Sequence, residues 1–184
     1  MKKCMVMYVS STGNTEQMAA AIAEQARKEG AEVVLCPASA LPKAELPTIT
    51  HWALGCSAHG VEELDGGEFL PALEQIEPYL RGKPVLLFGS YGWGAGAYMK
   101  PWEERTRLTG GLLCGEGFVF EGAPAEAAIE EGKQRAKILL AQKAFSMFSV
   151  YPLIREYLAG TTASGLYEAR LGHEEFGGET HVYA

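Results

Sequence analysis

The sequence predicts an α/β fold in which a doubly wound, five-stranded parallel sheet carries helices on both of its faces. Short apolar runs bounded by turn residues alternate with longer segments of helical periodicity, and the links between them are short. Apolar runs of this length are typical of parallel strands that are buried on both faces. The regular alternation of strand and helix is typical of a parallel sheet with crossover helices.

The elements follow in order along the first 144 residues. Strands are expected at 3–9, 31–36, 50–56, 84–90 and 112–120, the last interrupted by Cys114-Gly115-Glu116-Gly117. Helices are expected at 14–29, 68–80, 98–109 and 124–144, with Gly30 and Gly82 at the positions of C-caps. The crossover at 37–49 contains three prolines, so we expect no more than about one helical turn there.

The pattern stops near residue 145, which divides the chain into a domain at 1–144 and a C-terminal extension at 145–184. The extension begins with an apolar set between residues 145 and 158, continues through a Gly-rich link at 160–165, and ends in an alternating segment at 179–183. These apolar side chains are expected to be buried, either against the domain itself or against a second copy of the chain in a homodimer. The alternating end could add a strand to a sheet edge.

The composition excludes several classes of function. A net charge of −7 disfavours nucleic acid and anionic membranes as partners and would attract a protein with a basic surface. No apolar run reaches the roughly 18 residues needed to span a bilayer. Four cysteines in or beside apolar runs, without C-x-x-C spacing, indicate buried thiols and a cytoplasmic location. The histidines lack metal-ligand spacing, so no metal site is expected.

A hydroxyl-rich turn, Ser10-Ser11-Thr12-Gly13-Asn14-Thr15, joins the first strand to the first helix. The first backbone N–H groups of a helix have no intrahelical partner and lie at the positive end of its dipole, so they favour a phosphate. The turn contains no Lys or Arg. It therefore suits a phosphate monoester better than a nucleoside triphosphate with Mg2+.

Two further loops are expected at the same edge of the sheet, because the carboxyl ends of parallel strands meet there. One runs from Gly55 to Leu64, and the other, from Gly89 to Gly96, places Tyr91 and Trp93 among glycines. Glycines beside aromatic residues indicate backbone wrapped around a flat ligand on which a ring stacks. A phosphate at one end and a planar aromatic group at the other describe a mononucleotide, and the missing Mg2+ ligands favour FMN over ATP.

Other phosphate-handling folds lack their residues in this chain. There is no G-x-x-x-x-G-K-[ST] sequence and no G-x-G-x-x-G after the first strand, which argues against a triphosphatase and a dinucleotide-binding fold. A receiver domain would have acidic residues where this chain has serines, and the first loop lacks the Cys and Arg of a cysteine phosphatase.

These three motifs together resemble the short-chain flavodoxins of clostridia and related anaerobes, over roughly residues 1 to 142. The match rests on Ser10–Glu16, on Gly55-Cys56-Ser57-Ala58-x-Gly60-x-Glu62, and on Phe88-Gly89-Ser90-Tyr91-Gly92-Trp93-Gly94. The resemblance implies a sheet of order 2-1-3-4-5 and a bound FMN. The cofactor-binding residues that it implies are Ser10, Ser11, Thr12, Gly13, Asn14, Thr15, Ser57, Ala58, His59, Gly60, Glu62, Ser90, Tyr91, Gly92, Trp93 and Gly94.

The resemblance also implies a role for several of these positions. The Ser10–Thr15 turn would bind the phosphate, and Trp93 would stack on the outer face of the ring. The Gly60 carbonyl would contact N5 of the one-electron-reduced flavin, and Glu62 would accept from N3–H. At the inner face, where the family often has Met or Trp, this chain has His59.

The function that follows is single-electron shuttling between redox proteins, with no catalytic residue, and a partner with a basic docking surface. Two alternatives stay open at this point. One is an FMN-dependent reductase of a small quinone-like or metal-bound substrate, with the tail covering the flavin. The other is a flavodoxin-like docking or assembly module.

Overall fold

The computed structural model describes residues 2–141, 160–163 and 179–182. The chain divides into two compact units, Met1–Leu140 and Ala141–Ala184. Of the predicted extension, the apolar set at 145–158 lies outside the described residues, so the homodimer stays a prediction, as does a domain boundary at residue 144.

The first unit is built on a parallel sheet. Its strands are β1 (Lys3–Val9), β2 (Glu32–Pro37), β3 (His51–Cys56), β4 (Pro84–Tyr91), β5 (Leu112–Leu113) and β6 (Phe118–Glu121). Their order is β2-β1-β3-β4-β5, and β6 pairs with the later part of β4. The expected strand order is confirmed. The expected interruption of the fifth strand is also confirmed, because β5 and β6 are the two parts of that strand.

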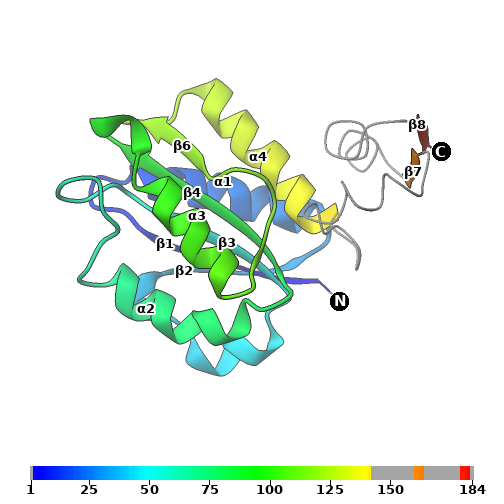
Figure 1. Cartoon of the computed structure of the whole chain (residues 1–184), viewed down its shortest axis with the longest axis horizontal. Helices are drawn as coiled ribbons and strands as arrows, with labels where there is room; N and C mark the ends of the chain where they lie inside the picture. The colour runs from blue at the N-terminus through cyan, green and yellow to red at the C-terminus, as the bar shows by residue number, and fades with distance from the viewer. Residues whose placement is uncertain (1, 142–159, 164–178, 183–184) are drawn as a thin grey trace. The chain divides into compact units, whose positions relative to one another are not determined.

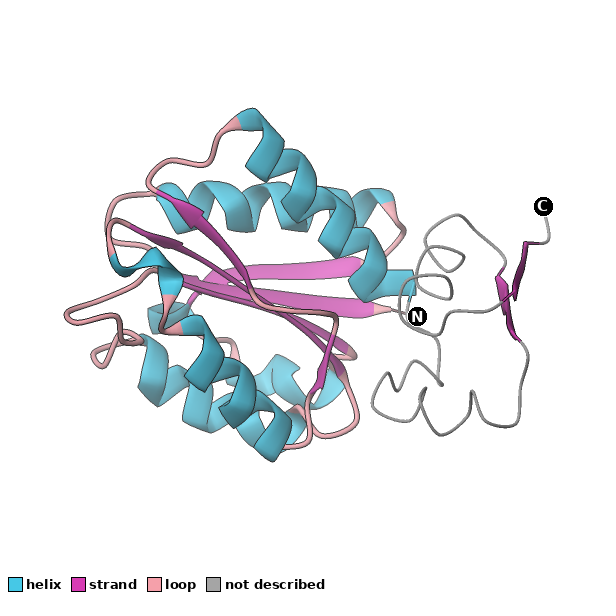
Figure 2. Cartoon of the chain, turned by 45° about the horizontal axis from the view of Figure 1, so that its top comes forward, coloured by secondary structure: helices cyan, strands magenta, loops and turns pink. Residues whose placement is uncertain are grey.

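Helices cover both faces of this sheet (Figures 1 and 2). They are α1 (Asn14–Lys28), α2 (Phe69–Ile76), α3 (Met99–Leu108) and α4 (Glu126–Ala141). The helix expected at 68–80 is α-helical only to Ile76 and continues as the 3-10 helix η3 (Glu77–Tyr79), where Pro78 cannot donate a helical hydrogen bond. The proline-rich crossover holds two 3-10 helices, η1 (Ala38–Ala40) and η2 (Lys43–Thr48), more than the single turn that was expected.

The alternation of side chains along the strands divides the core into two layers. Met5 and Met7 of β1 pack in the layer that contains residues of α2 and α3. Cys4 and Val6 lie between them in sequence and pack in the layer of α1 and α4. Successive strand residues point to opposite faces, so a continuous apolar run fills both layers. This two-sided burial fixes the register of the sheet and therefore the positions of the loops at its carboxyl edge.

The described part of the second unit is a pair of parallel strands, β7 (Gly160–Ala163) and β8 (Glu179–Val182). The alternating end was correctly expected to form a strand. The Gly-rich link at 160–165 was a wrong prediction, because four of its residues form β7. Thr161 and Thr162 are β-branched, and such residues favour extended backbone over a flexible link.

None of the helices in the described ranges combines the length and the hydropathy that a bilayer span requires.

The buried histidine at the start of β3 leads to a pH prediction. His51 is 6% exposed, and burial, with a smaller contribution from Lys2, lowers its pKa from 6.5 to about 4. Between these two values the unfolded chain takes up a proton that the folded chain does not, so stability falls as pH falls through this window. The loss assignable to His51 is about 3 kcal/mol at most.

Urea unfolding at pH 7 and pH 4.5 measures this loss. The His51→Asn variant should lose less stability between the two pH values than the wild type, because only the wild type carries the buried imidazole. Equal losses in both proteins would assign the acid sensitivity to other groups.

Candidate functional site

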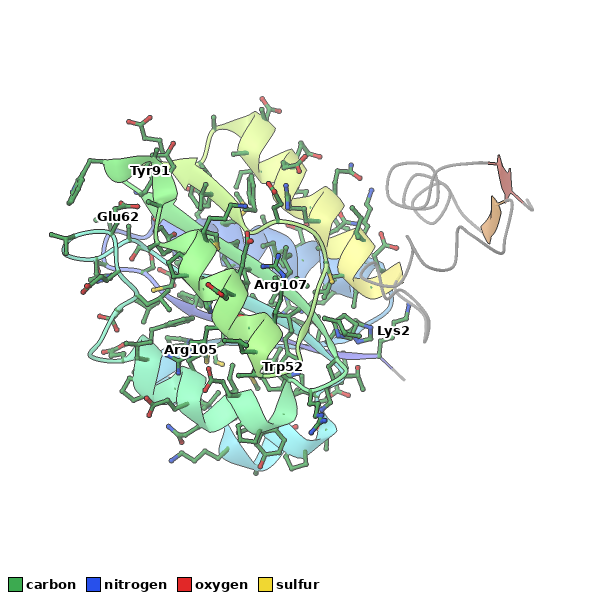
Figure 3. All side chains as sticks on the ribbon, viewed as in Figure 1. Lys2, Trp52, Glu62, Tyr91, Arg105 and Arg107 are labelled. Carbon is green, nitrogen blue, oxygen red and sulfur yellow. The ribbon has the colours of Figure 1, made fainter. Side chains whose placement is uncertain are left out.

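The loops that follow β1, β3 and β4 meet at the carboxyl edge of the sheet. The Thr15 and Ser90 hydroxyls lie 2.9 Å apart and join the first and third loops, and both side chains are buried. The N–H of Ala58 donates to the Ser90 carbonyl (2.8 Å) and joins the second loop to the third. Figure 3 shows Glu62 and Tyr91, from these two loops, at the same end of the first unit. The predicted convergence of three loops is therefore present.

The first loop forms an open cradle ahead of α1. Gly13 has the left-handed conformation (φ 86°) just before the helix begins at Asn14, and its carbonyl accepts from Gln17 N–H. Ser11 and Thr12 are exposed. A Cβ built on Gly13 would meet nothing within 4 Å, so this glycine serves the backbone conformation and the access of a ligand. The first amides of α1 thus face an accessible space with hydroxyls beside it.

The second loop is a tight turn closed by its own backbone. His59 and Glu63 exchange two N–H···O bonds of 2.9 Å, so the three residues between them form the tip. Gly60 at this tip has φ 52°, and Glu62 has φ 62°, which is uncommon for a residue with a side chain. Such a conformation costs free energy and clusters at binding sites. The Glu62 side chain is directed toward Gly94, where an added Cβ would lie 2.4 Å from Glu62 Cγ.

The third loop places aromatic side chains around a glycine-rich backbone. The Trp93 side chain is 62% exposed, whereas Tyr91 is partly buried. The short 3-10 helix η4 (Gly94–Gly96) follows Trp93. The Tyr91 carbonyl accepts from Gly122 N–H (2.8 Å), which ties this loop to the residues after β6. An exposed indole beside open backbone offers a stacking face for a planar ligand.

A buried tyrosine behind the loops holds two of them together. The Tyr98 hydroxyl donates to the Cys56 carbonyl (2.8 Å) and lies 3.4 Å from the Ser90 carbonyl. Burial raises the pKa of Tyr98 well above its ordinary value and that of Cys56 to about 12, so both groups stay neutral at physiological pH. The Tyr98 hydroxyl thus acts as a neutral donor that links the ends of β3 and β4.

Three buried polar atoms at this edge have no hydrogen-bond partner in the described residues. They are Ser10 Oγ, Ser57 Oγ and Glu62 Oε2, one in the first loop and two in the second. Buried polar atoms are normally satisfied, so each one needs an explanation. The two hydroxyls can bond to the phosphate and to the hydroxylated chain of FMN. The carboxylate oxygen can accept from the ring N–H.

Among the predicted binding residues, His59 was expected at the inner face of the flavin ring, but its side chain also contacts the phosphate turn. Its Nε2 lies 3.2 Å from Ser11 Oγ in the phosphate turn and 3.7 Å from Asp65 Oδ2, while its Nδ1 lies 3.0 Å from the Ser57 carbonyl. Burial alone would raise the pKa of Asp65, but the N–H groups of Phe69 and Glu68 and the nearby His59 together lower it. Asp65 is therefore a carboxylate at neutral pH.

The structure brings all sixteen predicted binding residues to this one edge. Ser10, Ser11, Thr12, Gly13, Asn14 and Thr15 stand at the β1–α1 turn, Ser57, Ala58, His59, Gly60 and Glu62 follow β3, and Ser90, Tyr91, Gly92, Trp93 and Gly94 end or follow β4. Sequence reasoning missed two residues, Tyr98 and Asp65. Tyr98 is separated from the three motifs by η4. Asp65 lies ahead of α2, where its Oδ1 accepts from the N–H groups of Glu68 and Phe69. Asp65 precedes a helical segment by a few residues, and that capping pattern was the signal available.

Comparisons with known proteins find similarity to flavodoxins. A family model described as Flavodoxin matches residues 6–148. The flavodoxin of Clostridium beijerinckii is 40% identical over 136 residues, which is 72% of this chain and 99% of that protein. The solved structure of two-electron reduced Megasphaera elsdenii flavodoxin superposes with a TM-score of 0.64 at 36% identity and covers 73% of this chain and 98% of that one.

A relative of a different kind also matches part of the chain. A carboxynorspermidine/carboxyspermidine decarboxylase of Herminiimonas arsenicoxydans is 52% identical over 58 residues, which is 30% of this chain and only 16% of that enzyme.

Proposed function

This chain belongs to the flavodoxin family and is an FMN-binding electron-transfer protein, and we propose that the three loops at the carboxyl edge of its first unit hold the FMN. The observation that carries the assignment of the site is that three buried polar atoms there, Ser10 Oγ, Ser57 Oγ and Glu62 Oε2, have no hydrogen-bond partner among the residues that the structure describes. When bound, FMN supplies one-electron redox chemistry. The protein's residues bind it, orient it and control its contact with water.

The phosphate end is assigned to the β1–α1 turn. The free amides at the start of α1 and the hydroxyls of Ser10, Ser11 and Thr12 supply donors, and Gly13 keeps the backbone accessible. Thr15 takes a supporting part, because its hydroxyl is bonded to Ser90.

The ring end is assigned to the other two loops. Trp93 offers an exposed face for stacking, and Glu62 offers a buried carboxylate oxygen as the acceptor for a ring N–H. Gly60, at the tip of the second loop, has open space around its Cβ position and a positive φ. Its peptide is therefore free to change orientation, which would let its carbonyl contact the flavin ring.

The partner is proposed to be a redox protein with a basic docking surface. The chain carries a net charge of −7, and the acidic side chains of Glu16, Glu63 and Glu121 are exposed near the carboxyl edge. Charge complementarity of this kind speeds the encounter of two proteins. We place the protein in the cytoplasm, because Cys4, Cys36, Cys56 and Cys114 are all free and buried, as is usual in a reducing compartment.

Cofactor identity and redox behaviour test this function together. The purified full chain, reconstituted with flavin, should release FMN on acid treatment, as identified by chromatography against FAD and riboflavin. Reduction should proceed in two one-electron steps without rapid NAD(P)H oxidation. Release of FAD, or no bound flavin, would contradict the FMN assignment. Rapid NAD(P)H turnover would support the reductase alternative, which the family assignment does not favour.

A separate proposal concerns the second unit. The decarboxylase of Herminiimonas arsenicoxydans matches 30% of the chain, close to the share that the Clostridium flavodoxin leaves unmatched after covering 72%. We infer that this match falls mainly on Ala141–Ala184 and that this unit is related to one segment of such an enzyme. The parallel pairing of β7 with β8 supports the inference, because parallel neighbours need a crossover and are typical of α/β domains. The match covers only 16% of that enzyme, so no decarboxylase activity is proposed for the chain.

If the second unit has a separate origin, FMN binding should not depend on it. A chain that ends at Gln142 should bind FMN with a dissociation constant within about twofold of the full chain, since all the proposed binding residues lie in the first unit. Quenching of flavin fluorescence measures both constants. Loss of FMN on truncation would mean that the second unit takes part in the site.

A further inference from the structure

The proposed phosphate site has an unusual charge balance. A phosphate monoester carries close to two negative charges at neutral pH, yet the turn from Ser10 to Thr15 contains no basic residue. One side chain that can become positive, His59, lies within hydrogen-bond distance of this turn, with its Nε2 3.2 Å from Ser11 Oγ.

The imidazole of His59 is held in a defined orientation. Its Nδ1 lies 3.0 Å from the Ser57 carbonyl, which can only accept, so Nδ1 carries a hydrogen in either charge state. The backbone of His59 is fixed by its two bonds to Glu63. Nε2 is left to face the phosphate turn, where it accepts from Ser11 when neutral and donates when protonated.

We propose that His59 is a phosphate-binding residue that supplies a proton-dependent positive charge to the FMN phosphate, instead of contacting only the flavin ring. The proposal rests on the FMN function stated above. Protonated Nε2–H would donate to the phosphate or to Ser11 Oγ, which frees the Ser11 hydroxyl to donate in turn. Such charge-assisted hydrogen bonds are roughly twice as strong as neutral ones.

Acidic side chains lie near the His59 imidazole. Asp65 Oδ2 lies 3.7 Å from Nε2, and Glu62, Glu63 and Asp65 all lie between β3 and α2, as His59 does. The first turn of α1 contains one acidic side chain, Glu16, which accepts a hydrogen bond from Tyr8 (2.8 Å). The segment 89–96, at the end of β4 and after it, contains no acidic or basic side chain. Histidine changes charge between about pH 5 and 8, so the affinity for FMN should weaken as pH rises through this range.

Paired measurements with FMN and riboflavin isolate the phosphate, since riboflavin has the same ring and no phosphate. Dissociation constants are measured between pH 5.5 and 8 for the full chain and for His59→Gln, which keeps an N–H donor but cannot become charged. At low pH the variant should bind FMN about tenfold more weakly than the wild type, the difference between a charge-assisted and a neutral hydrogen bond. The ratio of the two dissociation constants for FMN, variant to wild type, should approach one at pH 8. The same ratio for riboflavin should stay near one at every pH.

Two more variants sharpen the test. Asp65→Asn keeps an Oδ1 acceptor for the amides at the start of α2 but removes the carboxylate that lies 3.7 Å from His59 Nε2, so the pH profile of FMN affinity should differ from that of the wild type. Glu63→Gln, in the same loop, removes an exposed charge and leaves the backbone bonds to His59 in place. It serves as the matched control and should keep the pH profile of the wild type.

The outcomes separate this proposal from the FMN function itself. If the full chain binds no FMN, the proposed function fails. If it binds FMN but His59→Gln weakens FMN and riboflavin equally, His59 contacts the ring and the phosphate role is wrong. If the FMN ratio is the same at every pH, His59 supplies no titrating charge, and the proposal is overturned.

Discussion

Gly89→Ala is expected to lower the free energy of unfolding by about 3 kcal/mol or more, because a Cβ at this position has no space. It would lie 1.9 Å from the Cys56 carbonyl oxygen and 2.2 Å from the Tyr98 hydroxyl. The first of these atoms is backbone of the neighbouring strand, and the second is held by its hydrogen bond to that same carbonyl. Neither can yield without moving β3 away from β4. Urea unfolding measures the loss.

Gly92→Ala is the matched control, three residues further along the same segment. A Cβ on Gly92 would meet nothing within 4 Å, and the residue does not have a positive φ. Its effect on unfolding should therefore stay within about 0.5 kcal/mol. Similar losses in the two variants would mean that β3 and β4 tolerate the extra carbon and that their close approach is not what Gly89 provides.

Tyr98→Phe should cost about 1–3 kcal/mol of stability, because it removes the hydrogen bond to the buried Cys56 carbonyl and keeps the ring. It should also weaken FMN binding, since the lost hydroxyl lies against both the Cys56 and the Ser90 carbonyls, at the starts of two of the binding loops. Isothermal titration with FMN and urea unfolding measure the two effects.

The control for Tyr98 is Tyr79→Phe, in η3. The Tyr79 hydroxyl makes no hydrogen bond within the described part of the chain, and the residue is only partly buried. This substitution should leave both FMN affinity and stability nearly unchanged. A Tyr98→Phe protein that is destabilised but binds FMN normally would show that the hydroxyl supports the core without positioning the loops.

Most of the first unit could be predicted from local pattern. The apolar runs and the helical periodicity located the strands and the α-helices to within a few residues. This was possible because two-sided burial of a strand and amphipathicity of a helix both produce a pattern in consecutive residues. The Gly-containing interruption at 114–117 predicted the split of the fifth strand. The three loops could be brought together in advance because parallel strands end at a common edge.

What escaped prediction depends on contacts between distant residues. The bond from Tyr98 to Cys56 spans 42 positions, and the bond between Thr15 and Ser90 spans 75. No periodicity or spacing reports such pairs. The position of His59 beside Ser11 also depends on the fold of the second loop, where the backbone bonds to Glu63 turn the side chain toward the first loop. In the second unit, the glycines at 160 and 165 suggested a link, whereas the pairing with β8 determines that β7 is a strand.

The split of the fifth strand also bears on self-association of the chain through sheet edges. β5 has two residues and β6 has four. Gly117, between these two strands, donates its N–H to the buried carboxylate of Glu103 in α3 (2.6 Å). That amide is therefore already occupied, and this border of the sheet offers another chain no long row of free backbone groups. On the opposite border, β2 ends in Pro37, which has no N–H to donate. A sheet whose one border is short and interrupted, and whose other border ends in proline, is protected from edge-to-edge aggregation.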